Sequence, residues 1–421
     1  MFEKITLKSG LRIILYPMAN TEAVTFLVLI NTGSRYEEKQ RNGISHFLEH
    51  TFFKGTKKRP TTLAIAKELD KVGGVYNAFT GKEVMGFWVK IAAKHFSVAA
   101  DVLSDMLFNP LFDPRELEKE KKVIFEEINM IEDNPQRYVA DLWEKLLYGD
   151  QPIGWLIPGS KETVASVSRD DILSYFQKQF TAESAIVVLA GGFKKETVCC
   201  EAEKFFDKFP KGKIPEKKTT KEEQTKPEIL LHFKETEQTH LCLGVRAFNL
   251  FSPKRYILEV LSGILGGSMS SRLPVEVRQK RSLSYYVTAS LSQYTDSGYL
   301  VTQAGVDNRR IEEAIKIILQ EYRKLKTIKV PAPELKKVKE NIKGRMALAL
   351  ETSDAWASYL GEQEILEKQI LTPEEECAKI DKVNQEEILQ AAKEIFRPEK
   401  LNLALIGPFK EKEKFLKILT I

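Results

Sequence analysis

Two histidines and a glutamate stand at helical spacing in the segment NGISHFLEHTFFKGT, residues 42–56. On a helix, His46, Glu49 and His50 share one face, because residues three and four apart are neighbours there. Two imidazoles one turn apart can hold one Zn²⁺, and a carboxylate on the same face can reach a water at the open position of the metal. The H-x-x-E-H order therefore predicts one zinc ion per chain, with His46 and His50 as ligands and Glu49 as general base.

The third ligand must come from another element, and we expect it on a helix that begins at Pro114, since proline suits the first position of a helix. The apolar stripe of that helix carries two glutamates and consists of Glu120, Val123, Ile124, Glu127 and Ile131. A buried carboxylate needs a partner, which a dication supplies. We predict Glu127 as the third zinc ligand and Glu120 as a residue that orients a ligand. Glu126 points about 100° away from Glu127 and is the weaker candidate. The remaining histidines, His95, His232 and His240, are interpreted as core residues.

The elements that position these residues belong to a duplicated chain. Residues 167–193 (VSRDDILSYFQKQFTAESAIVVLAGGF) and 383–409 (VNQEEILQAAKEIFRPEKLNLALIGPF) match without a gap at an offset of 216 positions. Residues 211–228 are charged, contain proline and lack apolar periodicity, which predicts a linker. We therefore predict a zinc-binding half at 1–210, a linker at 211–228, and a homologous half at 229–421 that lacks the H-x-x-E-H motif.

Each half mixes apolar strands with amphipathic helices. Strands are predicted at 23–33, 83–91, 239–248 and 298–306, and helices at 95–107 and 311–325. This order favours an α+β fold of two tandem α/β sandwich halves, in which helices pack on an antiparallel sheet.

The composition excludes several classes of protein. The 421 residues include 64 Lys+Arg and 59 Asp+Glu, a formal net charge of +5. The lysine clusters are broken by glutamates, so we expect no nucleic-acid partner. The sequence shows neither the apolar core of a signal peptide nor a run of about 20 apolar residues. The four cysteines form no C-x-x-C pair. We expect a cytoplasmic protein that does not associate with membranes.

The motif and its glutamates resemble those of the pitrilysin, insulin-degrading-enzyme and mitochondrial-processing-peptidase family of zinc metallopeptidases, the inverzincins. In that family a glutamate follows 77 positions after the second histidine of H-x-x-E-H, which here is Glu127, and an auxiliary glutamate seven positions earlier is Glu120. The resemblance covers essentially the whole chain. It implies a short member whose two halves form a clamshell, and a zinc endopeptidase that hydrolyses unstructured peptides or presequence-like segments.

Two further segments resemble elements of the same family. SSRLPVEVRQKRSLSYYV, residues 270–287, resembles its R-x6-Y element. This implies that Arg278 and Tyr285 bind substrate carbonyls and stabilise the tetrahedral intermediate. The segment often reads Gly-Leu-x-Tyr in the family, but Ser282 stands here in place of the glycine. Tyr286 follows directly, which leaves open which tyrosine enters the site. VYNAFTG, residues 75–81, resembles the strand to which the family adds its substrate, with Asn77 and Ala78 offering backbone pairing.

The resemblance also implies a homodimer, while a heterodimer with a homologous subunit and a monomer remain open. Two other functions remain open from the sequence. The chain could be a non-catalytic scaffold or assembly subunit, or a catalytic subunit that needs a different chain to supply the arginine and tyrosine. The presence of every motif element favours a self-sufficient peptidase.

Overall fold

The chain forms two compact units in the computed structural model, which describes residues 2–421 apart from the side chains of residues 196, 197, 199 and 200. Unit 1 consists of residues 2–128, 155–218 and 348–370, and unit 2 of residues 129–154, 219–347 and 371–421. The boundaries expected from the duplication follow the order of the sequence. The units instead exchange two segments, since 129–154 belongs to unit 2 and 348–370 to unit 1.

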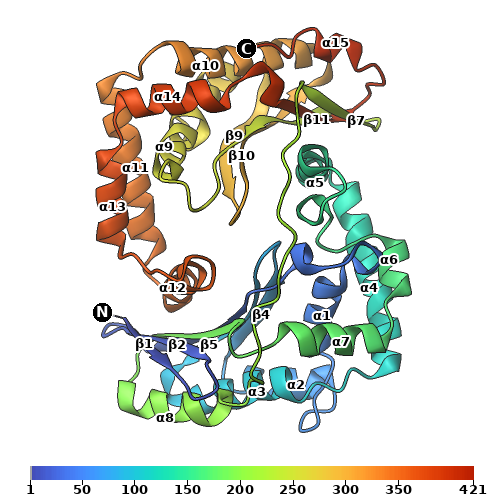
Figure 1. The fold of residues 1–421 in the computed structure, drawn as a ribbon, viewed down its shortest axis with the longest axis vertical. Coiled ribbons are helices and arrows are strands. Elements are labelled where there is room, and N and C mark those ends of the chain that lie inside the picture. Colours follow the sequence, from blue (N-terminus) through green and yellow to red (C-terminus); the bar gives the residue numbers. More distant parts are fainter. Residues whose placement is uncertain (1) are drawn as a thin grey trace. The chain divides into compact units, whose positions relative to one another are not determined.

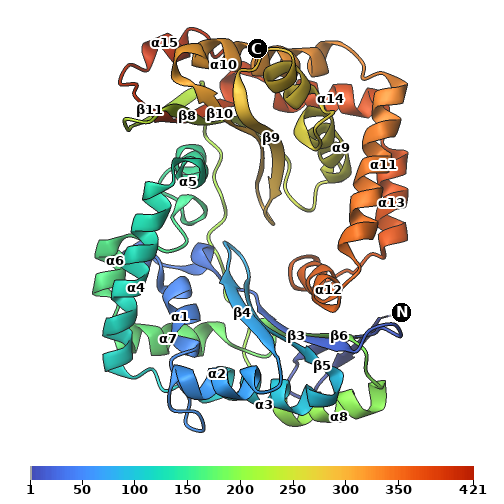
Figure 2. The same ribbon diagram turned by 180° about the vertical axis from the view of Figure 1, so that it is seen from behind.

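The sheet of unit 1 has the strand order β1-β2-β6-β3-β5-β4, which places β4 at one edge (Figures 1 and 2). Neighbouring strands are antiparallel except for β2 and β6, so the sheet is mixed rather than purely antiparallel. A parallel pair needs a long crossover, and the chain between these two strands supplies it. The strands are β1 (Glu3–Thr6), β2 (Arg12–Pro17), β3 (Ala23–Ile30), β4 (Val75–Thr80), β5 (Met85–Ala92) and β6 (Ala185–Gly191).

Both faces of this sheet are covered, which explains why β3 is buried from Val24 to Ile30 and mostly apolar. Phe26 and Val28 pack into the layer that contains the helices α1 and α3, whereas Leu27 and Leu29 pack into the layer that contains α12. Figures 1 and 2 show α12 over one face and α3 and α8 over the other. The helices are α1 (Ile44–Phe52), α2 (Thr62–Asp70), α3 (Phe96–Phe108), α4 (Pro114–Asp133, which ends in unit 2), α6 (Lys161–Ser166), α7 (Arg169–Gln179), α8 (Lys195–Phe206) and α12 (Ser353–Glu367).

Unit 2 repeats this plan with the strand order β7-β11-β8-β10-β9 and one parallel pair, β7 with β11. Helix α5 packs on one face of the sheet, and α9, α10 and α14 pack on the other. The strands are β7 (Glu228–Phe233), β8 (Gln238–Arg246), β9 (Ser284–Gln293), β10 (Gly298–Asp307) and β11 (Leu401–Gly407). The helices are α5 (Pro135–Tyr148), α9 (Arg255–Gly266), α10 (Ile311–Thr327), α11 (Ala332–Ala349), α13 (Pro373–Lys382), α14 (Gln385–Ile395) and α15 (Glu413–Leu416).

The elements predicted from the sequence are present. The strands expected at 23–33, 83–91, 239–248 and 298–306 are β3, β5, β8 and β10, and the helices expected at 95–107, from 114 and at 311–325 are α3, α4 and α10. Within the described chain, residues 210–227 form neither helix nor strand. None of the described helices combines the length and the apolar character needed to cross a membrane.

Candidate metal centre

The motif helix α1 begins with an unusual cap. Its N-cap residue, Gly43, has φ 97° and offers no side chain to the first turn. The buried carboxylate of Glu37 caps the helix instead, because it accepts hydrogen bonds of 2.8 Å from the backbone N–H groups of Gly43 and Ser45. These N–H groups would otherwise lack an acceptor at the helix start. The apolar face of α1 then packs into the core of unit 1 through Phe47, Leu48 and Phe52, while the histidines lie on the opposite side.

Three of the predicted residues meet at one point. His46 Nε2 and His50 Nε2 are 3.3 Å apart, and Glu127 Oε2 of α4 lies 3.5 Å from each of them. Ligands of a tetrahedral zinc with bonds of ~2.1 Å are ~3.4 Å apart, so this triangle has the size that zinc requires. In the described part of the chain, this is the only group of three histidine, cysteine or carboxylate ligands whose ligand atoms come within 4.8 Å of one another.

The neighbouring residues of α4 follow the prediction only in part. Glu126 is exposed and does not belong to the ligand group. Ile124 and Ile131 are buried as expected, but Val123 is 49% exposed. The expectation that Val123 belongs to a core-facing stripe is therefore wrong, because the buried face of the helix is turned away from Val123. That face includes Leu117, Ile124 and Ile128.

Glu120 lies behind His50 and has a cation on its other side. Its Oε1 is 2.8 Å from His50 Nδ1, and its Oε2 is 2.6 Å from Lys54 Nζ. Burial would raise the pKa of Glu120, but the hydrogen bonds from His50 and Lys54 outweigh burial and lower it. Burial would likewise lower the pKa of His50, but its bonds to Glu120 and Glu127 raise it to about 9. Sequence reasoning missed Lys54, although it stands four residues after His50, one further step along the same spacing.

Glu49 lies between the two histidines in the sequence and bonds to a strand rather than to the ligands. The pKa of its carboxylate is raised, chiefly because the group is buried and also because Glu127 is negatively charged. A hydrogen bond from Thr80 and the nearby His50 act in the opposite direction but do not outweigh burial. Thr80 Oγ1 donates to Glu49 Oε2 over 2.5 Å. Thr80 is the last residue of the edge strand β4, the strand that also carries the predicted substrate-binding residues. Of these, Asn77 is exposed and Ala78 is buried. Sequence reasoning also missed Thr80, since no local pattern links it to Glu49.

The predicted arginine and tyrosine belong to unit 2. Arg278 lies in η5 (Pro274–Gln279), a π-helical turn, with its Nη1 3.7 Å from Met269 Sδ. Tyr285 is 70% exposed near the start of β9. The hydroxyl of Tyr286 is engaged by His240, whose Nδ1 is 2.9 Å away. Of the two neighbouring tyrosines, Tyr285 is therefore the more exposed. The roles of Arg278 and Tyr285 stay predictions.

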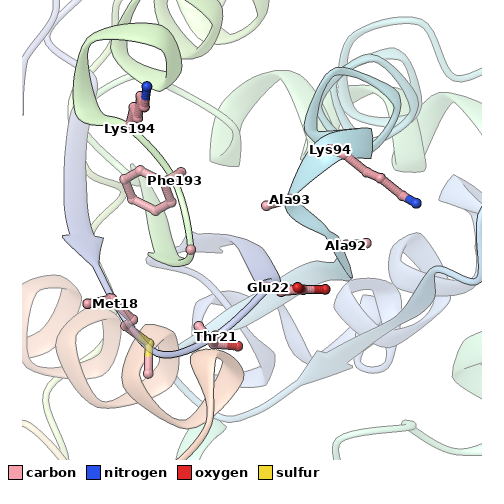
Figure 3. Close-up of a pocket in the computed structure, with 10 residues that line it drawn as sticks. Met18, Thr21, Glu22, Ala92, Ala93, Lys94, Phe193 and Lys194 are labelled. Atoms are coloured by element: carbon pink, nitrogen blue, oxygen red, sulfur yellow. The ribbon is translucent and has the colours of Figure 1, made fainter.

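Unit 1 also has a hollow of about 630 Å³, which shares no lining residue with the ligand group. It lies where the turn between β2 and β3 meets the ends of β5 and β6, with Phe193 on one side and Ala92 and Ala93 on another (Figure 3). No histidine or cysteine lines it, and its charged side chains, Lys94, Lys194 and Glu22, are exposed. It therefore has no residues suited to the chemistry that the motif predicts.

Comparison with known proteins matches both halves of the chain. Residues 12–157 match the family model described as insulinase, peptidase family M16, and residues 166–342 match the model described as the peptidase M16 inactive domain. An uncharacterized zinc protease of Bacillus subtilis is 37% identical over 409 residues, which cover 97% of this chain and 98% of the relative. One of Mycobacterium leprae is 31% identical over 413 residues, covering 97% and 92%.

Solved structures share the fold at lower identity. A protease from Helicobacter pylori superposes with a TM-score of 0.91 at 22% identity, covering 97% of this chain and 99% of its own. A Pseudomonas fluorescens protein titled as a peptidase M16 inactive domain gives a TM-score of 0.89 at 16% identity, covering 97% and 98%. The predicted fold of two α+β halves is thereby confirmed.

Proposed function

Because the chain belongs to peptidase family M16, the insulinase family, we propose that it is a zinc-dependent endopeptidase that hydrolyses unstructured peptides. The observation that carries this proposal is the ligand triangle of His46, His50 and Glu127, whose edges of 3.3, 3.5 and 3.5 Å fit tetrahedral zinc. The relatives from Bacillus subtilis and Mycobacterium leprae are named zinc proteases, which supports the same metal.

The chemistry of the site divides between the metal and the chain. A zinc ion held by these ligands would supply Lewis-acid chemistry, polarising a peptide carbonyl and activating water. Glu49 would take a proton from the attacking water and return it to the leaving amine, so that one water adds across the peptide bond. Its raised pKa suits both halves of that task, because the group must accept a proton and release it near neutral pH. Thr80 holds one oxygen of Glu49 and leaves the other for the proton.

The edge strand β4 supports a peptide substrate rather than a folded protein. In the sheet of unit 1, β4 pairs with β5 on one side only, so its other side can accept an extended chain. Main-chain pairing at Asn77 and Ala78 would bind a peptide through its backbone, which requires that the substrate be unfolded. Arg278 and Tyr285 are proposed to bind its carbonyl groups, with the exposed Tyr285 rather than Tyr286 in that role.

The test combines zinc content with cleavage of a quenched unstructured peptide. Glu49→Gln should keep bound zinc and lose about 10²–10⁴-fold in cleavage rate, because it removes the proton acceptor but no ligand. Glu127→Gln should lose zinc, whereas the matched control Glu126→Gln should keep both zinc and activity. Zinc binding without hydrolysis in the wild type would refute the peptidase and favour a scaffold. Loss of zinc on Glu126→Gln but not on Glu127→Gln would overturn the ligand assignment.

A further inference from the structure

Lys54 is the outermost member of a chain of contacts that leads to the metal ligands. Its Nζ lies 2.6 Å from Glu120 Oε2, and Glu120 Oε1 lies 2.8 Å from His50 Nδ1. The other nitrogen of that ring, His50 Nε2, faces the ligand group, 3.3 Å from His46 Nε2. One carboxylate therefore connects the ammonium of Lys54 to the back of a predicted zinc ligand.

The burial of these groups shows that Lys54 is needed to complete the contacts of Glu120. The side chain of Glu120 is 5% exposed, so it has little contact with water, and each of its oxygens has one of the two donors. The side chain of Lys54 is 26% exposed, which lets its stem reach inward from the surface. A carboxylate held on both sides has a fixed orientation, whereas one held only by His50 could rotate away from it.

Fixing Glu120 has a consequence for His50. A carboxylate that accepts from Nδ1–H selects the tautomer in which Nε2 carries the lone pair, and it also fixes the plane of the ring. We propose that Lys54 is a positioning residue that acts through Glu120 to hold His50 ready for zinc. The proposal deepens the proposed function and rests on its zinc site.

The backbone around Lys54 is anchored without its side chain. Thr56 N–H donates to Arg59 O over 2.7 Å, and Lys57 N–H donates to Asn109 O over 3.1 Å. The Thr56 hydroxyl also donates to Asp105. Replacing the Lys54 side chain should therefore leave the path of this segment unchanged, so that a change in zinc binding can be assigned to the lost ammonium.

The experiment measures the zinc dissociation constant by competition with a chelator. Lys54→Met should raise it about 10- to 100-fold, the usual effect of losing an outer partner of a metal ligand. Lys54→Arg keeps the charge and should stay within about threefold of wild type on the same scale. Lys57→Met, an exposed lysine three residues along, is the matched control and should bind zinc as the wild type does.

A double variant tests whether Lys54 acts through Glu120. In the Glu120→Gln background, adding Lys54→Met should change the zinc dissociation constant less than about twofold, because the connecting carboxylate is already gone. Equal zinc affinity of Lys54→Met and Lys57→Met would overturn the inference, as would fully additive effects in the double variant. Failure of the wild type to bind zinc would instead refute the proposed function, so the two failures are distinguishable. If Lys54→Met does not fold, Lys54→Gln serves in the same comparisons.

Discussion

Arg59 offers the clearest test of how the segment after the motif helix is held. Its side chain is 2% exposed, and it lies between α1 and α2. Its Nη1 lies 2.8 Å from Asp105 Oδ2, while Nη2 contacts Asp101 Oδ2 at 2.5 Å and Glu68 Oε2 at 2.6 Å. Asp101 and Asp105 belong to α3, so one guanidinium fastens this segment to a core helix. We predict that Arg59→Met destabilises unit 1 strongly.

The expected loss of unfolding free energy in Arg59→Met depends on how deeply each partner of Arg59 is buried. Asp105 is 7% exposed, and removing one partner of a buried ion pair costs about 3–5 kcal/mol, because the other charge stays buried. Asp101 and Glu68 are 31% and 44% exposed, where such pairs contribute about 0–1 kcal/mol each. Asp105 keeps its bonds from Thr56 and Asn109, which places the expected loss at the lower end, about 3 kcal/mol.

Urea unfolding followed by circular dichroism measures this loss, and hydrogen exchange of the α3 amides assigns it to unit 1. The matched control is Lys58→Met, which removes a neighbouring exposed lysine paired with Asp101 and should cost less than about 1 kcal/mol. If Arg59→Met costs no more than Lys58→Met, the argument from burial is refuted. Faster exchange in unit 2 alone would contradict the assignment to α3.

Three further predictions concern the motif helix and its surroundings. Burial raises the pKa of Glu37 from 4.5 to about 7, so between these pH values the chain takes up a proton when it folds. The folded state therefore loses stability as the pH rises from 4.5 to 7. Glu37→Gln does not titrate, so its free energy of unfolding in urea, relative to that of the wild type, should rise by up to about 3 kcal/mol between pH 4.5 and 7. A difference between the two proteins that does not change with pH would contradict this. Thr80→Val removes a charge-assisted hydrogen bond to Glu49 and should slow peptide cleavage about 10- to 100-fold with zinc content unchanged. Thr80→Ser keeps the hydroxyl and should retain the wild-type rate. Equal cleavage rates of Thr80→Val and the wild type would exclude a positioning role for Thr80. Gly43→Ala should destabilise the protein more than Gly10→Ala, because both have positive φ but only at Gly43 would the added carbon lie 2.5 Å from a backbone oxygen, and equal melting temperatures would disprove this.

The sequence was sufficient for the residues whose partners are local. His46, Glu49 and His50 are related by helical spacing, and Glu127 lies on a helix whose start is marked by a proline. The structure brings both histidines and Glu127 together. Lys54 and Thr80 could not be assigned in the same way. Their partners, Glu120 and Glu49, are 66 and 31 positions away, and the contacts depend on how α4 and β4 pack against α1.

In the fold, too, local features could be predicted from the sequence, whereas features that depend on distant segments could not. The duplication predicted two α+β halves, and the strands and helices follow the apolar patterns. The parallel pairs β2–β6 and β7–β11 were not predicted, because strand direction depends on the path of the connecting chain. The exchange of α5 and α12 between the units was not predicted either. Each helix buries an apolar face, and both sheets offer an apolar face to receive it, so periodicity does not distinguish them.

Polar contacts distinguish the two sheets where apolar patterns do not. Glu364 of α12 is 1% exposed, and a carboxylate buried to that extent is costly unless other groups compensate its charge. Arg12 of β2 and Lys4 of β1 do so, at 2.8 and 2.7 Å from Glu364 Oε1. These strands belong to unit 1, which is the unit that α12 joins. Helix α12 is therefore matched to its sheet by charge, and the apolar layer beneath it supplies burial without selecting the partner.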